Sequence, residues 1–286
     1  MGSTAPRPAA APTRAGAVAA TPEVESGAAT VAAEPAAERV QGSGGGETMT
    51  APDAVEHARA VVRQRFPDAL VAVLGGSAAE GRLTATSDLD IAVLVPGGTA
   101  TRRETIRSDG RPVELFVHTR DGLNALFSAD AATRRATMQT IYATGIVVLD
   151  ESGQADRIRE DASEQLRSGP APLGEEAVET KRYGLTDALD DLVDTEDRYE
   201  RLAVGGYVLN TAADLLCDHH RAWIGGGKWL PRRLLAADAR RGAALLDGHL
   251  RLCETAEPGA LAVAAGEVLE LVGGPVREGY ARTWRA

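Results

Sequence analysis

The chain has little of what marks membrane, secreted or zinc-binding proteins. Its 286 residues include only two cysteines and five histidines. The spacing of these cysteines and histidines does not match that of a zinc site, so a zinc site is not expected. The two cysteines are predicted to be buried free thiols. No apolar run is long enough for a transmembrane helix or a secretory signal. The sequence therefore favours a cytoplasmic protein without a membrane partner.

Basic residues are also scarce. The chain has 31 Lys and Arg against 41 Asp and Glu, which gives a net charge of −10. Broad electrostatic binding to nucleic acid needs a basic surface, so a nucleic-acid partner is disfavoured and a small-molecule or protein substrate fits better. Lysine is rare in particular, because Lys181 and Lys228 are the only two.

Residues 1–50 contain no aromatic side chain and are rich in Ala, Pro, Gly, Ser and Thr. Such a segment cannot bury enough apolar surface to offset the entropy lost on ordering. We therefore predict that residues 1–50 form a disordered tail.

Beyond this segment the hydrophobic pattern changes once. Strand-like runs near 69–74, 88–95, 111–117 and 145–149 alternate with helical spacing over 52–66, 121–139 and 154–167. A Ser-Gly-Pro-Ala-Pro stretch at 168–172 is typical of a hinge, and after it leucines repeat only at helical spacing. These patterns predict an α+β fold, with a small mixed-sheet domain over residues 51–168 and an α-helical bundle over 172–286.

Two aspartates mark the second strand-like run. Residues two apart on a strand share a face, so Asp88 and Asp90 stand side by side while Leu89 and Ile91 face the core. Two carboxylates this close repel each other unless a cation lies between them. Oxygen ligands of this kind suit Mg²⁺, which proteins commonly hold by one or two carboxylates plus substrate phosphates.

A glycine turn precedes these aspartates. Gly75 and Gly76 allow a sharp turn at a strand end and a close approach to a ligand. Ser77 is predicted to cap a short helix whose free N–H groups favour a phosphate. Arg82 lies in the same loop and adds positive charge.

The stretch Gly76-Ser77…Ser87-Asp88-Leu89-Asp90-Ile91 resembles the nucleotidyltransferase superfamily, which includes DNA polymerase beta. It is most similar to small bacterial members that adenylylate antibiotics or proteins. The pattern of that family includes a third carboxylate on a neighbouring strand. Glu114 fits this position, because the apolar residues beside it in the run 111–117 take the core side.

The resemblance implies a mechanism and its site residues. Asp88, Asp90 and Glu114 would be catalytic and would hold two Mg²⁺ ions, with Glu114 acting either as a metal ligand or as the base. The nucleotide would be bound by a further set, Gly76, Ser77, Arg82 and Ser87. ATP would be the donor, pyrophosphate would leave, and the acceptor would be a small molecule such as an aminoglycoside-like antibiotic, with the helical bundle shaping its cleft.

Two stretches of the predicted bundle are candidates for chemistry. Lys228 lies in a glycine-rich loop between Trp223 and Trp229, where a compact charge suits a phosphate, although the loop is equally typical of a helix connection. Acidic residues cluster at helical spacing over residues 187–194. They favour a solvated helix face, and the alternative is that one of them binds a cationic acceptor or takes its hydroxyl proton.

Two other functions remain open from the sequence. The chain could adenylylate a protein, as an antitoxin acting on a partner toxin. It could also be a nucleotide-binding regulatory protein without catalysis, although three clustered acids are an electrostatic liability without a metal to bind.

Overall fold

The computed structural model describes residues 49–98 and 100–283. The predicted disordered tail lies outside these residues except at its end, where Thr50 caps the first helix through a reciprocal pair of hydrogen bonds with Asp53. Met49 packs partly against the core, so these two residues belong to the folded part. None of the helices in the described residues is long and apolar enough to cross a membrane.

The N-terminal half is built on a five-stranded mixed sheet of order β3-β4-β2-β1-β5. Its strands are β1 (Val71–Leu74), β2 (Leu89–Leu94), β3 (Arg102–Ser108), β4 (Arg111–His118) and β5 (Ile146–Asp150). Strand β2 pairs parallel to β4, and the other neighbouring strands pair antiparallel. Its helices are α1 (Ala51–Arg65), α2 (Gly76–Ala79), α3 (Arg120–Thr133), α4 (Thr137–Thr144) and α5 (Ala155–Ser168).

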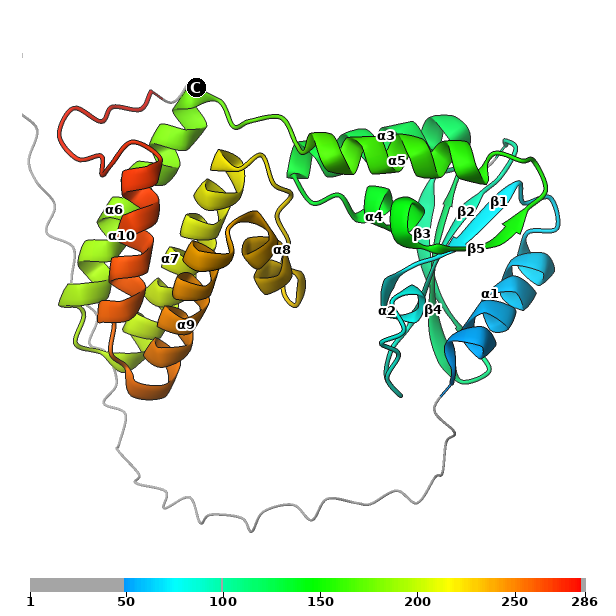
Figure 1. Cartoon of the computed structure of the whole chain (residues 1–286), viewed down its shortest axis with the longest axis horizontal. Coiled ribbons are helices and arrows are strands. Elements are labelled where there is room, and N and C mark those ends of the chain that lie inside the picture. The colour runs from blue at the N-terminus through cyan, green and yellow to red at the C-terminus, as the bar shows by residue number, and fades with distance from the viewer. Residues whose placement is uncertain (1–48, 99, 284–286) are drawn as a thin grey trace, which may run out of the picture. The chain divides into compact units, whose positions relative to one another are not determined.

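Helices cover both faces of this sheet (Figure 1). Leu89, Ile91 and Val93 of β2 pack on the face of α1. Ala92 and Leu94 point the other way, toward α3, α4 and α5. This alternation is the one that the sequence predicts for β2, and it leaves Asp88 and Asp90 on the α4 face.

Strand β3 was not predicted, because its seven residues carry one apolar side chain, Ile106. It pairs only with β4 and lies at the sheet edge, where hydrophobic alternation is not required. Asp109 and Gly110, which join the two strands, both have positive φ (48° and 76°). An Asp-Gly pair is a strong hairpin signal and could have revealed the strand.

The predicted single helix over 121–139 is wrong, because the helical conformation is interrupted between the end of α3 and the start of α4. Arg134 and Ala136 adopt the left-handed conformation, with φ of 61° and 56°. The Asp130 carboxylate accepts a hydrogen bond from the Met138 backbone N–H (2.6 Å) and so supports the start of α4. No glycine or proline marks this break in the sequence.

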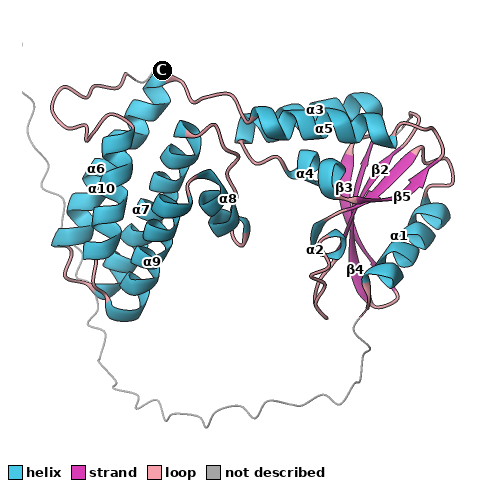
Figure 2. Cartoon of the chain, viewed as in Figure 1, coloured by secondary structure: helices cyan, strands magenta, loops and turns pink. Residues whose placement is uncertain are grey.

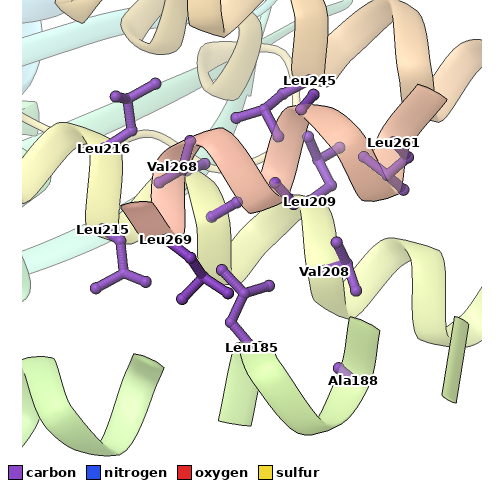
Figure 3. Close-up of a cluster of buried hydrophobic side chains, with 14 of the residues drawn as sticks. Leu185, Ala188, Val208, Leu209, Leu215, Leu216, Leu245, Leu261, Val268 and Leu269 are labelled. Carbon is purple, nitrogen blue, oxygen red and sulfur yellow. The ribbon is translucent and has the colours of Figure 1, made fainter. Parts of the chain in front are cut away.

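The C-terminal part is helical, as predicted (Figure 2). It comprises α6 (Glu175–Asp194), α7 (Arg198–His219), α8 (Trp229–Ala237), α9 (Ala239–Thr255) and α10 (Gly259–Leu271). Their apolar faces enclose one core, in which Leu185, Leu209 and Val268 meet from three helices (Figure 3). The predicted α+β class, with a mixed sheet followed by helices, is therefore confirmed.

The predicted domain boundary at 168–172 stays a prediction. The elements change type there, yet the described residues group into one compact unit. Of the two cysteines, Cys217 is buried as predicted, but Cys253 is exposed. Its neighbour Leu252 occupies the core position of α9, so the next residue turns away from the core.

Candidate active site

Three carboxylates converge where β2 and β4 run side by side. Asp90 and Glu114 are directly paired across the parallel strands, and Asp88 lies two residues before Asp90 on the same face. One carboxylate oxygen from each of the three lies within 4.8 Å of the others. An all-oxygen donor set of this size fits a hard divalent cation such as Mg²⁺.

The glycine turn presses against this carboxylate group. Gly76 has a φ of +61°, and a Cβ on it would lie 2.0 Å from Asp90 Oδ2. The Gly75 N–H also donates to the Asp90 carbonyl (2.8 Å), which fixes the turn to β2. Position 76 therefore requires glycine both for its conformation and for the space that Asp90 needs.

The predicted cap on helix α2 is wrong. Gly75 occupies the N-cap position without a side-chain hydrogen bond, and Ser77 lies inside the four-residue helix. The extended backbone of Gly75 lets the helix begin one residue before Ser77. Ser77 still lines a cavity with Asp88 and Asp90, so its predicted place near the carboxylates agrees with the structure although its capping role does not.

The carboxylates carry an excess of negative charge. The pKa of Asp90 is raised to about 6, mainly by burial and in addition by the charges of Asp88 and Glu114. The charges of Lys228 and Arg103 act in the opposite direction. A bound divalent cation would relieve the same repulsion, because it offers opposite charge at short range.

Sequence reasoning missed Arg103. Its guanidinium donates a hydrogen bond to Glu114 Oε1 and lies over the Phe116 ring, 5.3 Å from the centroid. This pairing raises the pKa of Arg103. Arg103 comes from the edge strand β3, so recognising the Asp-Gly hairpin would have been the way to find it.

Lys228 reaches the carboxylates from the helical part. The loop before it is tight, because a Cβ on Gly225 would lie 2.5 Å from the Trp229 Cβ. Lys228 occupies the N-cap position of α8, and its charge acts on Asp90. The structure thus brings the lysine singled out in the sequence to the carboxylate group.

Two adjoining cavities surround these residues. The first has a volume of about 600 Å³ and the second about 370 Å³. Both are lined by Gly76, Asp88, Asp90, Lys228 and Trp229. Every nucleotide-binding or catalytic residue predicted from the sequence lines at least one of them.

Ser87 and Arg82 line the second cavity only. The Ser87 hydroxyl accepts a hydrogen bond from the Thr84 backbone N–H (2.9 Å), which holds the loop before Asp88 in a turn. Arg82 pairs with Glu80. Arg82 is therefore near the carboxylate group but already has an acidic partner.

Two hydrogen bonds hold the loop that precedes Lys228. The Ile224 N–H donates to the Arg134 carbonyl (2.8 Å), and the Trp223 indole N–H donates to the Leu166 carbonyl (3.0 Å). Arg134 in turn forms an ion pair with Asp218 of α7 at 2.9 Å. The left-handed segment between α3 and α4 thus holds this loop in place through Arg134.

The acidic residues of α6 do not join the site. Asp190 pairs with Arg277, whereas Lys181 pairs with Asp214 at 2.6 Å. None of these four residues lines either cavity. The acidic stretch at 187–194 is therefore a helix face apart from the carboxylate group.

Comparison with known proteins gives a match to a family model and a match to a solved structure. Residues 55–132 match the model of the nucleotidyltransferase domain family. No curated protein sequence gives a significant match. Among solved structures, a nucleotidyltransferase-like protein from Exiguobacterium sibiricum 255-15 aligns with a TM-score of 0.41 and 11% identity, over 76% of this chain and 74% of that one.

The domain match includes the glycine turn and all three carboxylates. It confirms the resemblance found in the sequence: a nucleotidyltransferase domain stands in the N-terminal half and a helical region follows it. The match therefore supports nucleotidyltransferase activity at the general level.

Proposed function

We propose that this protein transfers AMP from ATP to a hydroxyl group of a small-molecule acceptor, with Mg²⁺ as its metal, and releases pyrophosphate. The observation that carries the proposal is the meeting of Asp88, Asp90 and Glu114 beside the Gly76 turn. An aminoglycoside-like antibiotic is a candidate acceptor by resemblance alone.

Asp88 and Asp90 would hold Mg²⁺ together with Glu114. When bound, Mg²⁺ supplies Lewis-acid charge neutralisation at the phosphate oxygens. The residues themselves organise the rest of the reaction. Gly76 lets the backbone approach the phosphates, and Ser77 and Ser87 line the cavity in which the triphosphate is proposed to lie.

The reaction exchanges one phosphorus–oxygen bond for another. The acceptor oxygen forms a bond to the α-phosphorus while the bond to the β-phosphate oxygen breaks, and pyrophosphate carries that electron pair away. Lys228 would stabilise the negative charge that grows on the leaving pyrophosphate. The acceptor hydroxyl proton goes to a base, for which Glu114 is the candidate.

Glu114 has two possible roles, and one variant separates them. If Glu114 is the base, Glu114→Gln should retain metal binding and lose transfer. If it is a metal ligand, the same variant should lose affinity for Mn²⁺, a paramagnetic substitute whose binding can be counted directly.

The decisive experiment follows a radiolabel from the α-phosphate of ATP. The protein is incubated with Mg²⁺, labelled ATP, and panels of aminoglycosides, other hydroxyl compounds and cell lysate. We expect a labelled product and stoichiometric pyrophosphate, both lost on chelation of the metal and in Asp90→Asn. Transfer by Asp90→Asn at the wild-type rate would disprove the assignment.

A further inference from the structure

The larger cavity is lined by charged side chains of both signs. Eight charged side chains line it: the acids Glu80, Asp88, Asp90 and Glu114 and the cations Arg103, Arg135, Lys228 and Arg233. Asp88, Asp90 and Glu114 are the proposed metal ligands. A cationic acceptor bound here would have to find its carboxylate partner elsewhere.

The remaining acid is already engaged. Glu80 pairs with Arg82 and lies 3.9 Å from an Arg232 nitrogen. Among the described residues that line the larger cavity, no carboxylate is therefore left over for an amino group of the acceptor.

Two of the cations that line the larger cavity, Arg135 and Arg233, differ from Glu80 in having no partner of opposite charge in an ion pair within the described residues. The charge of the exposed Arg135 nevertheless acts on Asp130, and Arg233 lies over the Trp229 ring, 5.6 Å from its centroid.

Arg233 is half-buried, and one of its nitrogens donates to Thr140 Oγ1 (2.9 Å). Burial without a carboxylate partner lowers the pKa of Arg233, which means that the charged form is not fully compensated. An anion placed beside it would supply the missing compensation.

The two arginines line the larger cavity and not the second one. Ser77 and Ser87 line the second cavity only, whereas Gly76 lines both cavities. Arg135 lies between α3 and α4 and approaches the Gly226 loop, whereas Arg233 reaches α4 from α8. Thr137, Thr140 and Thr144 of α4 line the same cavity as the arginines, and Thr140 contacts Arg233.

We propose that Arg135 and Arg233 form a binding site for an anionic group, a phosphate or a carboxylate, on the acceptor. This inference rests on the proposed transfer reaction and narrows its acceptor to an anionic hydroxyl compound. It argues against a polycationic aminoglycoside as the acceptor, because the cavity offers that molecule unpaired cations in place of carboxylates.

The test uses the full-length protein with the donor side filled by Mg²⁺ and a non-hydrolysable ATP analogue. Inorganic phosphate is the probe, and the NMR signals of the arginine Nε–H groups report its binding. We expect saturable binding in wild type, weakened at least roughly tenfold in Arg135→Gln and in Arg233→Gln, which is about the loss of one charge-assisted contact. Arg240→Gln is the matched control, because Arg240 pairs with Glu267 and lines neither cavity.

Three results would overturn the inference. The first is the absence of saturable phosphate binding in wild type. The second is equal binding in the two cavity variants and in the control. The third is displacement of the ATP analogue by phosphate in step with the arginine signals, which would assign both arginines to the triphosphate instead.

Calorimetry with kanamycin provides an independent arm. We expect no binding of this polycation to the analogue-loaded protein, and tight binding would contradict the anionic site. Failure of the proposed function would give a different result. The ATP analogue would then bind equally well with and without Mg²⁺, and equally well to wild type and to Asp90→Asn. Phosphate binding at the two arginines can be measured separately, in the absence of nucleotide.

Discussion

Arg103 of β3 and Glu114 of β4 form an ion pair on the face of the sheet that carries the carboxylate group. The charge of Arg103 also acts on Asp90, where it partly opposes the rise in pKa that burial and the other two carboxylates cause. In the metal-free protein, Arg103 is thus a counter-ion for the same carboxylates that are proposed to hold Mg²⁺. An arginine and a metal ion cannot both neutralise Glu114 fully, so the two should compete.

Removing Arg103 should therefore strengthen metal binding. We expect Arg103→Gln to lower the Kd for Mn²⁺ roughly three- to tenfold, the scale of one partly solvated charge interaction. Titration followed by electron paramagnetic resonance measures this constant. Arg107→Gln is the control, because Arg107 lies on the same strand but donates to the Gly110 carbonyl. Equal affinity in wild type and Arg103→Gln would show that this ion pair does not compete with the metal.

The raised pKa of Asp90 predicts a pH-dependent stability. The folded pKa of about 6 lies above the ordinary value of 3.8, so ionised Asp90 destabilises the metal-free fold at neutral pH. Asp90→Asn should then raise the free energy of unfolding by about 2 kcal/mol at pH 8. The gain should shrink as the pH falls through 6, because wild-type Asp90 takes up its proton.

Urea denaturation in the presence of a chelator, at several pH values, measures this gain. Asp156→Asn serves as the control, because the Asp156 side chain is 93% exposed. A gain that is the same at pH 5 and pH 8 would contradict the raised pKa of Asp90, which burial and the charges of Asp88 and Glu114 produce.

Replacing only one partner of the ion pair between Arg134 and Asp218 should lower the free energy of unfolding. Both side chains are 12% exposed. We expect Arg134→Ala to lose about 3–5 kcal/mol of unfolding free energy, because it leaves the Asp218 charge buried and unpaired. Adding Asp218→Asn should recover part of the loss, since the amide oxygen can still accept from the Leu173 N–H, as Asp218 does at 2.8 Å. A double-mutant cycle in urea tests this, and strictly additive losses would contradict the coupling.

The carboxylate group could be predicted from the sequence because its parts are local. A two-residue repeat places Asp88 and Asp90 on one face of a strand, and the apolar neighbours of Glu114 assign its face in the same way. Their meeting also needs β2 and β4 to be adjacent, and the family resemblance implied that adjacency where periodicity could not.

Arg135 and Arg233 illustrate what the sequence does not contain. Arg135 is placed by two left-handed residues, Arg134 and Ala136, which have no glycine or proline to announce them. Arg233 lies 93 residues from Thr140, the side chain that it contacts. Contacts at this separation depend on how the helices pack, and amphipathic periodicity defines a buried face without naming its partner.

Lys228 offers the sharpest test of a role predicted from the sequence. Its charge acts on Asp90, and it lines both cavities, so we expect it to contact the triphosphate or the leaving pyrophosphate. A contact that strengthens as charge develops stabilises the transition state more than the bound substrate. Lys228→Ala should therefore lower kcat/KM roughly 10²-fold, and Lys228→Arg should recover only part of the loss, because a planar fork replaces a point charge.

The other lysine provides the control for this experiment. Lys181 pairs with Asp214 in the helical part and lines neither cavity, so Lys181→Ala removes the same charge away from the carboxylates. Steady-state kinetics of pyrophosphate release, with thermal melts to verify folding, compares the three variants. If Lys228→Ala and Lys181→Ala lose the same small amount of activity, the effect is one of net charge and Lys228 has no part in transfer. A large loss confined to Lys228→Ala, in a protein that melts like wild type, would instead show that the helical part contributes a catalytic group to the nucleotidyltransferase domain.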